Sequence, residues 1–131
     1  MIIDSNIFLE VILEQERVES ASEFLNEILK GEKQGFISTF SIDSIILNLV
    51  KNNAKKNKII SFLNGLLKYE GLRFYQIKIK DRIDALNLMS KHKLDYEDAV
   101  ILQSAISTSS DEIVSFDKHF DNIKEIKRIE P

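Results

Sequence analysis

Apolar residues along the chain alternate between short runs and longer stretches with helical spacing. Five short runs have the length and composition of β-strands: Met1–Asp4, Gly35–Ser38, Leu72–Ile77, Glu112–Phe116 and Ile126–Ile129. Six longer stretches predict helices: Ser5–Leu13, Glu16–Leu29, Ser41–Lys51, Lys58–Tyr69, Ile79–Lys91 and Asp95–Ile106. Because strands that alternate with helices form parallel sheets, we expect an α/β fold with a mainly parallel sheet of about five strands.

Composition narrows this picture to one globular domain. The chain has 131 residues, of which 44% are hydrophobic and 30% are charged, and its formal net charge is -3. This length suits one hydrophobic core, so we expect a single domain over residues 1–131. No apolar run reaches the roughly 18 residues that span a membrane, and Met1–Glu10 lacks the basic start of a secretory signal. We therefore expect a cytoplasmic protein.

Charge and cysteine content limit the chemistry. The chain contains no cysteine, which excludes disulfides, thiolate metal sites and a cysteine nucleophile. Its mildly acidic balance argues against binding duplex nucleic acid by bulk charge alone. The same balance is compatible with a nuclease whose acids hold metal ions.

Three aspartates stand where a parallel sheet usually carries its chemistry. Asp4 ends the first strand candidate, Asp117 follows the fourth, and Asp98 lies in the first turn of an apolar helix. Ligands bind beyond the C-terminal ends of such strands, so we expect all three side chains at one edge. Each alone is also explained as a helix N-cap or a first-turn acid. Together they repel one another unless a divalent cation neutralises them, and oxygen ligands favour Mg²⁺ or Mn²⁺.

In their order and spacing these residues resemble the PIN-domain family, close to the VapC-type toxin ribonucleases. The resemblance runs the full length of the chain and rests on three segments: Met1-Ile2-Ile3-Asp4-Ser5-Asn6, Asp98-Ala99 opening an apolar helix, and Val114-Ser115-Phe116-Asp117-Lys118-His119-Phe120. It implies a three-layer α/β/α fold in which a five-stranded parallel sheet is flanked by helices. It also implies an endoribonuclease that cuts RNA with Mg²⁺ or Mn²⁺. The implied metal ligands are Asp4, Asp98 and Asp117, and the implied secondary residues are Ser5, Asn6 and Ser115.

One position departs from the family pattern. Members usually carry a glutamate early in the helix after the second strand, and counting from Ser38 this position is Ser44. The neighbouring acid is Asp43. At about 100° per residue from the apolar stripe of that helix, Asp43 falls on the flank and Ser44 nearly opposite. We therefore expect Asp43 to stand in for the glutamate as a fourth catalytic acid, unless it is an ordinary first-turn acid. The stripe consists of Ile42, Ile45, Ile46, Leu49 and Val50.

Two further segments allow two interpretations each. A basic patch is either a solvated helix junction or a surface that steers the RNA backbone. It consists of Lys51, Lys55, Lys56 and Lys58. The apolar stretch Ile59–Leu67 is either core or part of a dimer face. His92 and His119 have no second histidine at ligand spacing, so we expect no histidine metal site. His119 is either a solvated surface residue, which we favour, or a contact to a phosphate, since it lies two residues after Asp117.

The resemblance also bears on partners. It implies a small antitoxin protein as a partner and a homodimer, beside the RNA substrate. The alternative hypothesis, motivated by the missing glutamate, is a catalytically weakened PIN domain that binds RNA or protein. A Mg²⁺ titration followed by calorimetry separates the two hypotheses, since absence of binding at millimolar metal favours the binding module.

Overall fold

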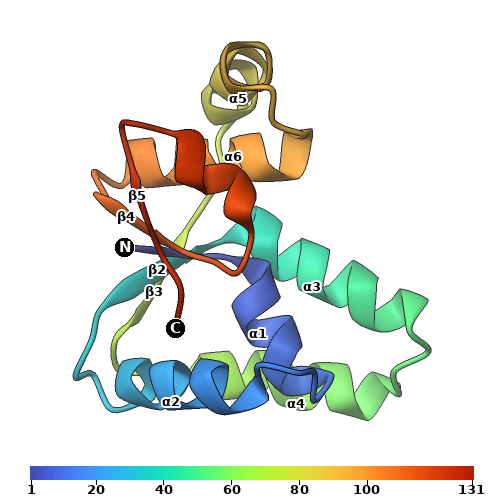
Figure 1. Cartoon of the computed structure of the whole chain (residues 1–131). Helices are drawn as coiled ribbons and strands as arrows, with labels where there is room; N and C mark the ends of the chain where they lie inside the picture. The colour runs from blue at the N-terminus through green and yellow to red at the C-terminus, as the bar shows by residue number, and fades with distance from the viewer.

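In a computed structural model, which describes residues 1–131, five parallel strands form one sheet in the order β3-β2-β1-β4-β5 (Figure 1). The strands are β1 (Ile2–Ile3), β2 (Gly35–Ser38), β3 (Leu72–Tyr75), β4 (Glu112–Val114) and β5 (Lys127–Ile129). The helices are α1 (Ser5–Ile12), α2 (Val18–Leu29), α3 (Thr39–Lys51), α4 (Lys56–Leu66), α5 (Ile79–His92) and α6 (Tyr96–Ser107), with a 3-10 helix, η1 (Lys118–Asn122), after β4. The predicted α/β class and the five-stranded parallel sheet are confirmed.

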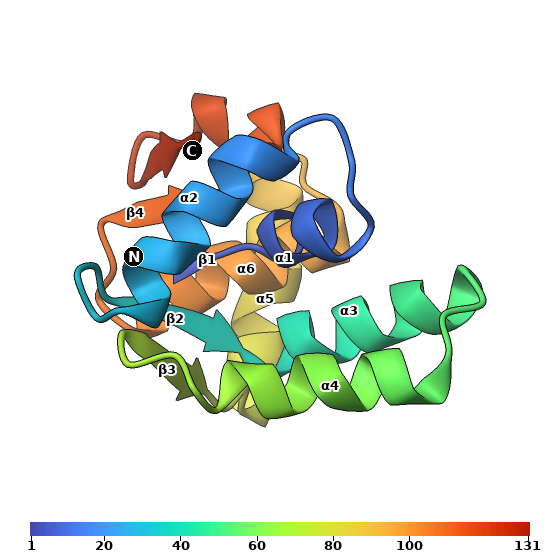
Figure 2. The same cartoon turned by 90° about the horizontal axis from the view of Figure 1, so that it is seen from below.

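Helices cover both faces of this sheet, as expected for a three-layer α/β/α fold (Figures 1 and 2). Ile2 and Ile113 pack into the buried cluster that includes α6, whereas Ile3 and Val114 pack into the cluster that includes α1 and α2. Successive side chains of a strand point to opposite faces, so each central strand contributes to both clusters. Because both faces are covered, these strands are apolar at consecutive positions rather than alternating.

The predicted elements are all present, but their ends differ. The pairing of β2 with β3 ends at Ser38 and Tyr75. Beyond it the amide of Ile77 donates to the side-chain hydroxyl of Thr39 at 3.2 Å instead of to a neighbouring strand, so β3 is shorter than expected. The hydroxyl of Ser38 accepts from the amide of Ser41 at 2.9 Å. This N-cap starts α3 at Thr39, two residues earlier than predicted.

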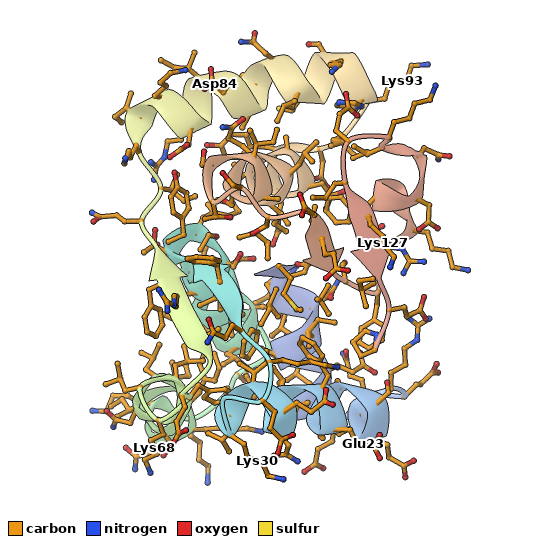
Figure 3. All side chains as sticks on the ribbon, turned by 90° about the vertical axis from the view of Figure 1, so that its left-hand side faces the viewer. Glu23, Lys30, Lys68, Asp84, Lys93 and Lys127 are labelled. Carbon is orange, nitrogen blue, oxygen red and sulfur yellow. The ribbon has the colours of Figure 1, made fainter.

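The outermost helix is α5, which lies over α6 on the side away from the sheet (Figure 3). Asp84 lies on this helix, and Lys93, with a positive φ, ends it. Three apolar side chains on α5 are more than half exposed, namely Ile79, Ile83 and Leu86. None of the helices has both the length and the apolar content that crossing a membrane requires.

Candidate functional site

The strand order brings the three predicted aspartates to one edge of the sheet. β1 pairs with β4, and the amide of Asp4 donates to the carbonyl of Val114 at 3.0 Å. Asp117 lies three residues beyond the end of β4 as the N-cap of η1, and Asp98 comes from the first turn of α6. A cavity of about 240 Å³ opens between them, lined by Asp4, Ser5, Asn6, Leu9, Asp95, Glu97, Asp98 and Asp117.

Asp4 is the most deeply buried of the three, with 3% of its surface exposed. Its Oδ2 accepts from the hydroxyl of Ser115 at 2.5 Å and from the side-chain amide of Asn6 at 2.7 Å, and its Oδ1 accepts from the hydroxyl of Ser5 at 3.1 Å. Burial nevertheless raises the pKa of Asp4 from 3.8 to about 6, although the hydrogen bonds from Ser115, from the backbone amide of Asn6 and from Ser5 oppose the rise. The fold therefore holds this carboxylate at an electrostatic cost.

Ser115 connects two of the aspartates. Its hydroxyl donates to Asp4 and accepts from the amide of Asp117 at 2.9 Å and from the side-chain amide of Asn6 at 2.9 Å. One hydroxyl has one proton and two acceptor sites, so all its hydrogen-bonding capacity is used inside the site. The structure thus brings Ser5, Asn6 and Ser115 around Asp4.

Asp98 is buried without acting as a helix cap. Asp95 takes that role, because its Oδ1 accepts from the amide of Asp98 at 2.9 Å. Burial raises the pKa of Asp98 to about 6, and the negative charges of Asp95 and Asp117 add to the rise against the hydrogen bond from His119. The side chain of Asp98 is therefore free for a role other than capping.

His119 joins Asp98 to Asp117. Its Nδ1 lies 3.0 Å from Asp98 Oδ2 and 3.1 Å from Asp117 Oδ1, although 69% of the side chain is exposed. The hydrogen bond to Asp98 and the charge of Asp117 raise the pKa of His119 above 6.5. The prediction of a surface histidine describes its exposure but missed these contacts. A signal was present, since His119 lies only two residues after Asp117 in the sequence.

The expected orientation of α3 was wrong. Asp43 is exposed and does not line the cavity, whereas the hydroxyl of Ser44 donates to Glu97 Oε1 at 2.5 Å. The buried face of α3 is centred on Ser41, Ile45 and Leu49. The apolar stripe predicted from the sequence omitted the buried Ser41 and included Val50, which is 57% exposed. It was therefore rotated relative to the buried face of the helix. Relative to the buried face, Asp43 points outward, and Ser44 lies at the boundary of that face on the side of the site.

The basic patch lies away from the cavity. Its four lysines are exposed at the end of α3, in the following turn and in the first turn of α4, at the end of this helical pair that is far from the sheet (Figure 2). They are Lys51, Lys55, Lys56 and Lys58. The stretch Ile59–Leu67 proves to be mixed, because Leu66 is buried in the core whereas Ile60 and Leu67 are 46% and 75% exposed.

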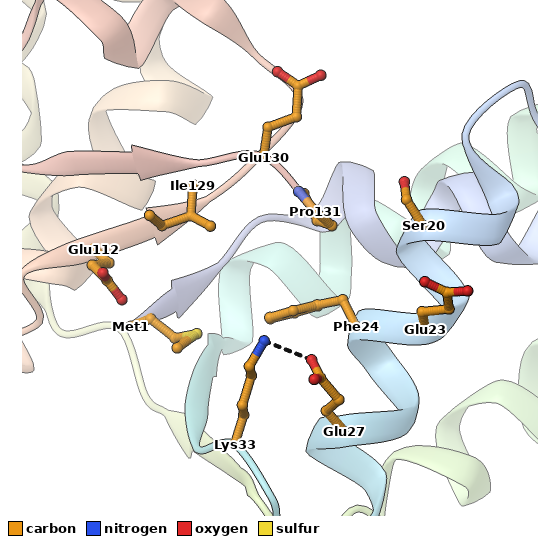
Figure 4. Close-up of a pocket in the computed structure, with 10 residues that line it drawn as sticks. All are labelled: Met1, Ser20, Glu23, Phe24, Glu27, Lys33, Glu112, Ile129, Glu130 and Pro131. Carbon is orange, nitrogen blue, oxygen red and sulfur yellow. Dashed lines mark ion pairs between the residues drawn. The ribbon is translucent and has the colours of Figure 1, made fainter.

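A second hollow lies between α2 and the sheet, away from the aspartates (Figure 4). Its volume is about 500 Å³, and its lining includes four glutamates and only one lysine. Lys33 pairs with Glu27 at 2.6 Å. Ligand atoms of three acidic or histidine residues converge within 4.8 Å of one another at one place only, at Asp98, Asp117 and His119. The candidate metal centre is therefore at the aspartate edge and not in this larger hollow.

The residues at the aspartate edge fit a divalent cation. Most of the donors are carboxylate oxygens, which suit a hard divalent cation, and one imidazole lies beside them. Burial raises the pKa of Asp4 and of Asp98, and the charges of neighbouring carboxylates add to the rise. A cation bound among these oxygens would supply compensating positive charge.

Comparison with known proteins identifies the family. The model of the PIN domain matches residues 1–126, so the chain belongs to the PIN domain family. No curated protein matches the chain by sequence.

Solved structures with the same fold include three toxins or toxin complexes. VapC20 of Mycobacterium tuberculosis, described as a sarcin-ricin loop cleaving toxin, aligns with a TM-score of 0.77 at 12% identity over 99% of this chain and 98% of its own. VapBC2 of Rickettsia felis, bound to a DNA fragment from its promoter, gives 0.72 at 18% identity, with 98% and 96% covered. A toxin-antitoxin complex from Klebsiella pneumoniae gives 0.71 at 18% identity, with 95% and 93% covered.

Proposed function

We propose that this PIN domain is an endoribonuclease that depends on Mg²⁺ or Mn²⁺ and acts as the toxin of a VapBC-type toxin-antitoxin pair. The observation that carries the proposal is the convergence of Asp4, Asp98 and Asp117 on one cavity, two of them with a pKa near 6. The fold shared with VapC20 and the two toxin-antitoxin complexes supports the toxin role. The antitoxin partner, the homodimer and the cytoplasmic location belong to this proposal.

Each aspartate has a defined task in this proposal. Asp4, Asp98 and Asp117 would hold the cation, and a divalent cation would supply activation of water and neutralisation of charge on the attacked phosphate. Ser115 and Asn6 fix the orientation of the Asp4 carboxylate through their hydrogen bonds. His119 keeps Asp98 and Asp117 together at the exposed rim.

The test is cleavage of RNA by the purified protein with Mg²⁺, with Mn²⁺ and with a chelator. We expect cleavage only with a divalent cation, and products with 5′-phosphate and 3′-hydroxyl ends. Asp98→Asn is expected to lower the rate by at least about 100-fold, because catalytic carboxylates contribute on this scale.

The matched control is Asp84→Asn, which removes a carboxylate on α5 that pairs only with Lys80 at 2.7 Å. This variant should retain the full rate. Cleavage that persists in the chelator, or in Asp98→Asn, contradicts the proposal.

A second function is favoured by Ser44, which stands where the family usually has a glutamate. With that acid absent, the domain would bind RNA or protein with little cleavage. Binding of RNA without cation-dependent products in the same experiment supports this function over the nuclease.

A further inference from the structure

Glu97 is a fourth acid near the three aspartates that are proposed to hold the cation, and it does not act as a helix cap. It is the second residue of α6, half-buried, and it lines the same cavity as Asp4 and Asp98. A glutamate in the first turn of a helix is stabilised by the helix dipole and needs no partner. Here the carboxylate reaches two other helices: it accepts from Ser44 on α3 at 2.5 Å and from Ser5 on α1 at 3.4 Å.

The hydrogen bonds around Glu97 leave negative charge uncompensated. Ser5 has a single hydroxyl proton, yet its oxygen contacts both Asp4 Oδ1 and Glu97 Oε1. Only one of these two carboxylates receives that proton at a time. Both known contacts of Glu97 involve Oε1, so Oε2 remains available as a ligand atom. Two carboxylates that share one hydroxyl repel each other unless a cation lies near them.

We propose that Glu97 is a further carboxylate ligand of the cation site, held toward Asp4 by Ser44 and Ser5 as positioning residues. The proposal rests on the proposed function, since it adds a ligand to that metal centre. The carboxylate on the side of the cavity next to α3 thus comes from α6 and not from α3 itself.

The test measures Mn²⁺ binding by calorimetry on the full chain, without any activity readout. Glu97→Gln keeps the size and the hydrogen-bonding capacity of the side chain but removes its charge. We expect its Mn²⁺ affinity to fall by at least about tenfold, the lower end of losses when partners of a metal site are removed. Ser44→Ala, which removes only the positioning hydrogen bond, should cause a smaller loss.

A swapped variant tests the location of the carboxylate. Ser44 Oγ lies 2.5 Å from Glu97 Oε1, so a carboxylate on residue 44 reaches the same part of the cavity. We expect Ser44→Glu combined with Glu97→Gln to restore Mn²⁺ affinity relative to Glu97→Gln alone. The matched control is Glu19→Gln on α2, an exposed acid with the same charge change and no contact with the cavity. Thermal unfolding in a chelator confirms that each variant is folded.

The outcomes separate this inference from the proposed function. Wild-type affinity in both Glu97→Gln and Ser44→Ala overturns the role of Glu97 and leaves the nuclease proposal intact. Loss of Mn²⁺ binding in Asp43→Asn but not in Glu97→Gln assigns the role to Asp43 and also overturns it. A swapped variant that is folded but binds no better than Glu97→Gln overturns the placement at Ser44. If wild-type protein does not bind Mn²⁺, the proposed function itself fails.

Discussion

Capping and site chemistry coincide in two of the aspartates. Asp4 accepts from the amide of Asn6 at 3.4 Å and caps α1, while Asp117 accepts from the amide of His119 at 2.8 Å and caps η1. The two interpretations available from the sequence were therefore not alternatives. An N-cap lies at the point where a strand becomes a helix, and in a parallel sheet that point is the edge at which ligands bind.

Asp98→Asn is expected to change how folding stability depends on pH. In metal-free protein the folded-state pKa of Asp98 is about 6, above the unfolded value of 3.8, so the folded state binds this proton more tightly. The stabilising contribution of Asp98 is fully present below its pKa in the unfolded state, and it is lost as the pH rises through its pKa in the folded state. An asparagine side chain does not titrate, so the variant should gain about 2 kcal/mol relative to wild type between about pH 4 and pH 7.

Urea unfolding in a chelator at both ends of this range measures the difference. Subtracting the variant from the wild type cancels the acids whose pKa is lowered, such as Asp121 and Glu130, which act in the opposite direction. At the upper pH, Mg²⁺ should stabilise the wild type more than the variant. A difference that stays constant with pH would show that Asp98 ionises equally readily in both states.

The sequence was informative about acids that follow strands and less so about side chains on helices. Asp4 and Asp117 were placed correctly at the sheet edge because a strand end fixes the direction of the chain. Asp43 was misplaced because the predicted apolar stripe was rotated from the real buried face of α3, which exchanges the positions expected for Asp43 and Ser44. Glu97 was missed because its cavity contacts join α6 to α3 and α1, a relation that no local spacing encodes.

At the scale of elements, the shortest strand could be predicted because of its composition. β1 contains only Ile2 and Ile3, and both are fully buried on opposite faces of the sheet. Consecutive apolar residues of this kind indicate a central strand covered on both sides. The end of β3 could not be predicted, since it depends on the hydroxyl of Thr39 from another element.

The attachment of α5 depends on one buried acid. Asp81 accepts from the amide of Lys78 at 2.7 Å, from the hydroxyl of Ser107 at 2.7 Å and from that of Tyr75 at 2.9 Å. Burial favours the neutral acid, but these hydrogen bonds outweigh it and lower the pKa of Asp81. One carboxylate thus connects the start of α5 to β3 and to the end of α6.

Asp81→Ala is therefore expected to destabilise the fold by about 2 kcal/mol or more, because it removes three hydrogen bonds to a charged group. Urea unfolding at neutral pH measures the loss. Asp84→Ala on the same helix is the matched control and should cost no more than about 0.5 kcal/mol, since its pair with Lys80 is exposed. Mn²⁺ affinity should be retained, because Ser107 and Asp98 lie at opposite ends of α6. Equal stability of the two variants would show that α5 is held by its apolar contacts alone.

At the scale of the whole molecule, the net charge of -3 conceals a division between acids and bases. Asp4, Asp98, Asp117 and Glu97 gather in one cavity, where a cation can neutralise them. The basic patch lies about two helical turns beyond Ser44 along α3. A nucleic acid that extended from the cavity along α3 would meet this positive charge, which the net charge does not reveal.

The basic patch should contribute phosphate contacts if it guides RNA to the cavity. Binding of single-stranded RNA to Asp98→Asn protein, measured at several salt concentrations, gives a slope of about -0.7 per phosphate contact on a double logarithmic plot. Replacing the four lysines of the patch by glutamine is expected to weaken binding and to make this slope shallower by at least about one contact.

The matched control replaces four exposed lysines before or at the start of strands, at the opposite edge of the sheet: Lys30, Lys68, Lys124 and Lys127 (Figure 3 labels three of them). Both variants change the net charge equally, so a general electrostatic effect alters both slopes to the same extent. If the basic patch guides RNA specifically, only the variant of the patch has a shallower slope. Equal slopes would favour the simpler interpretation that the patch is a solvated helix junction. The four lysines of the patch and the four control lysines carry the same charge and differ only in position.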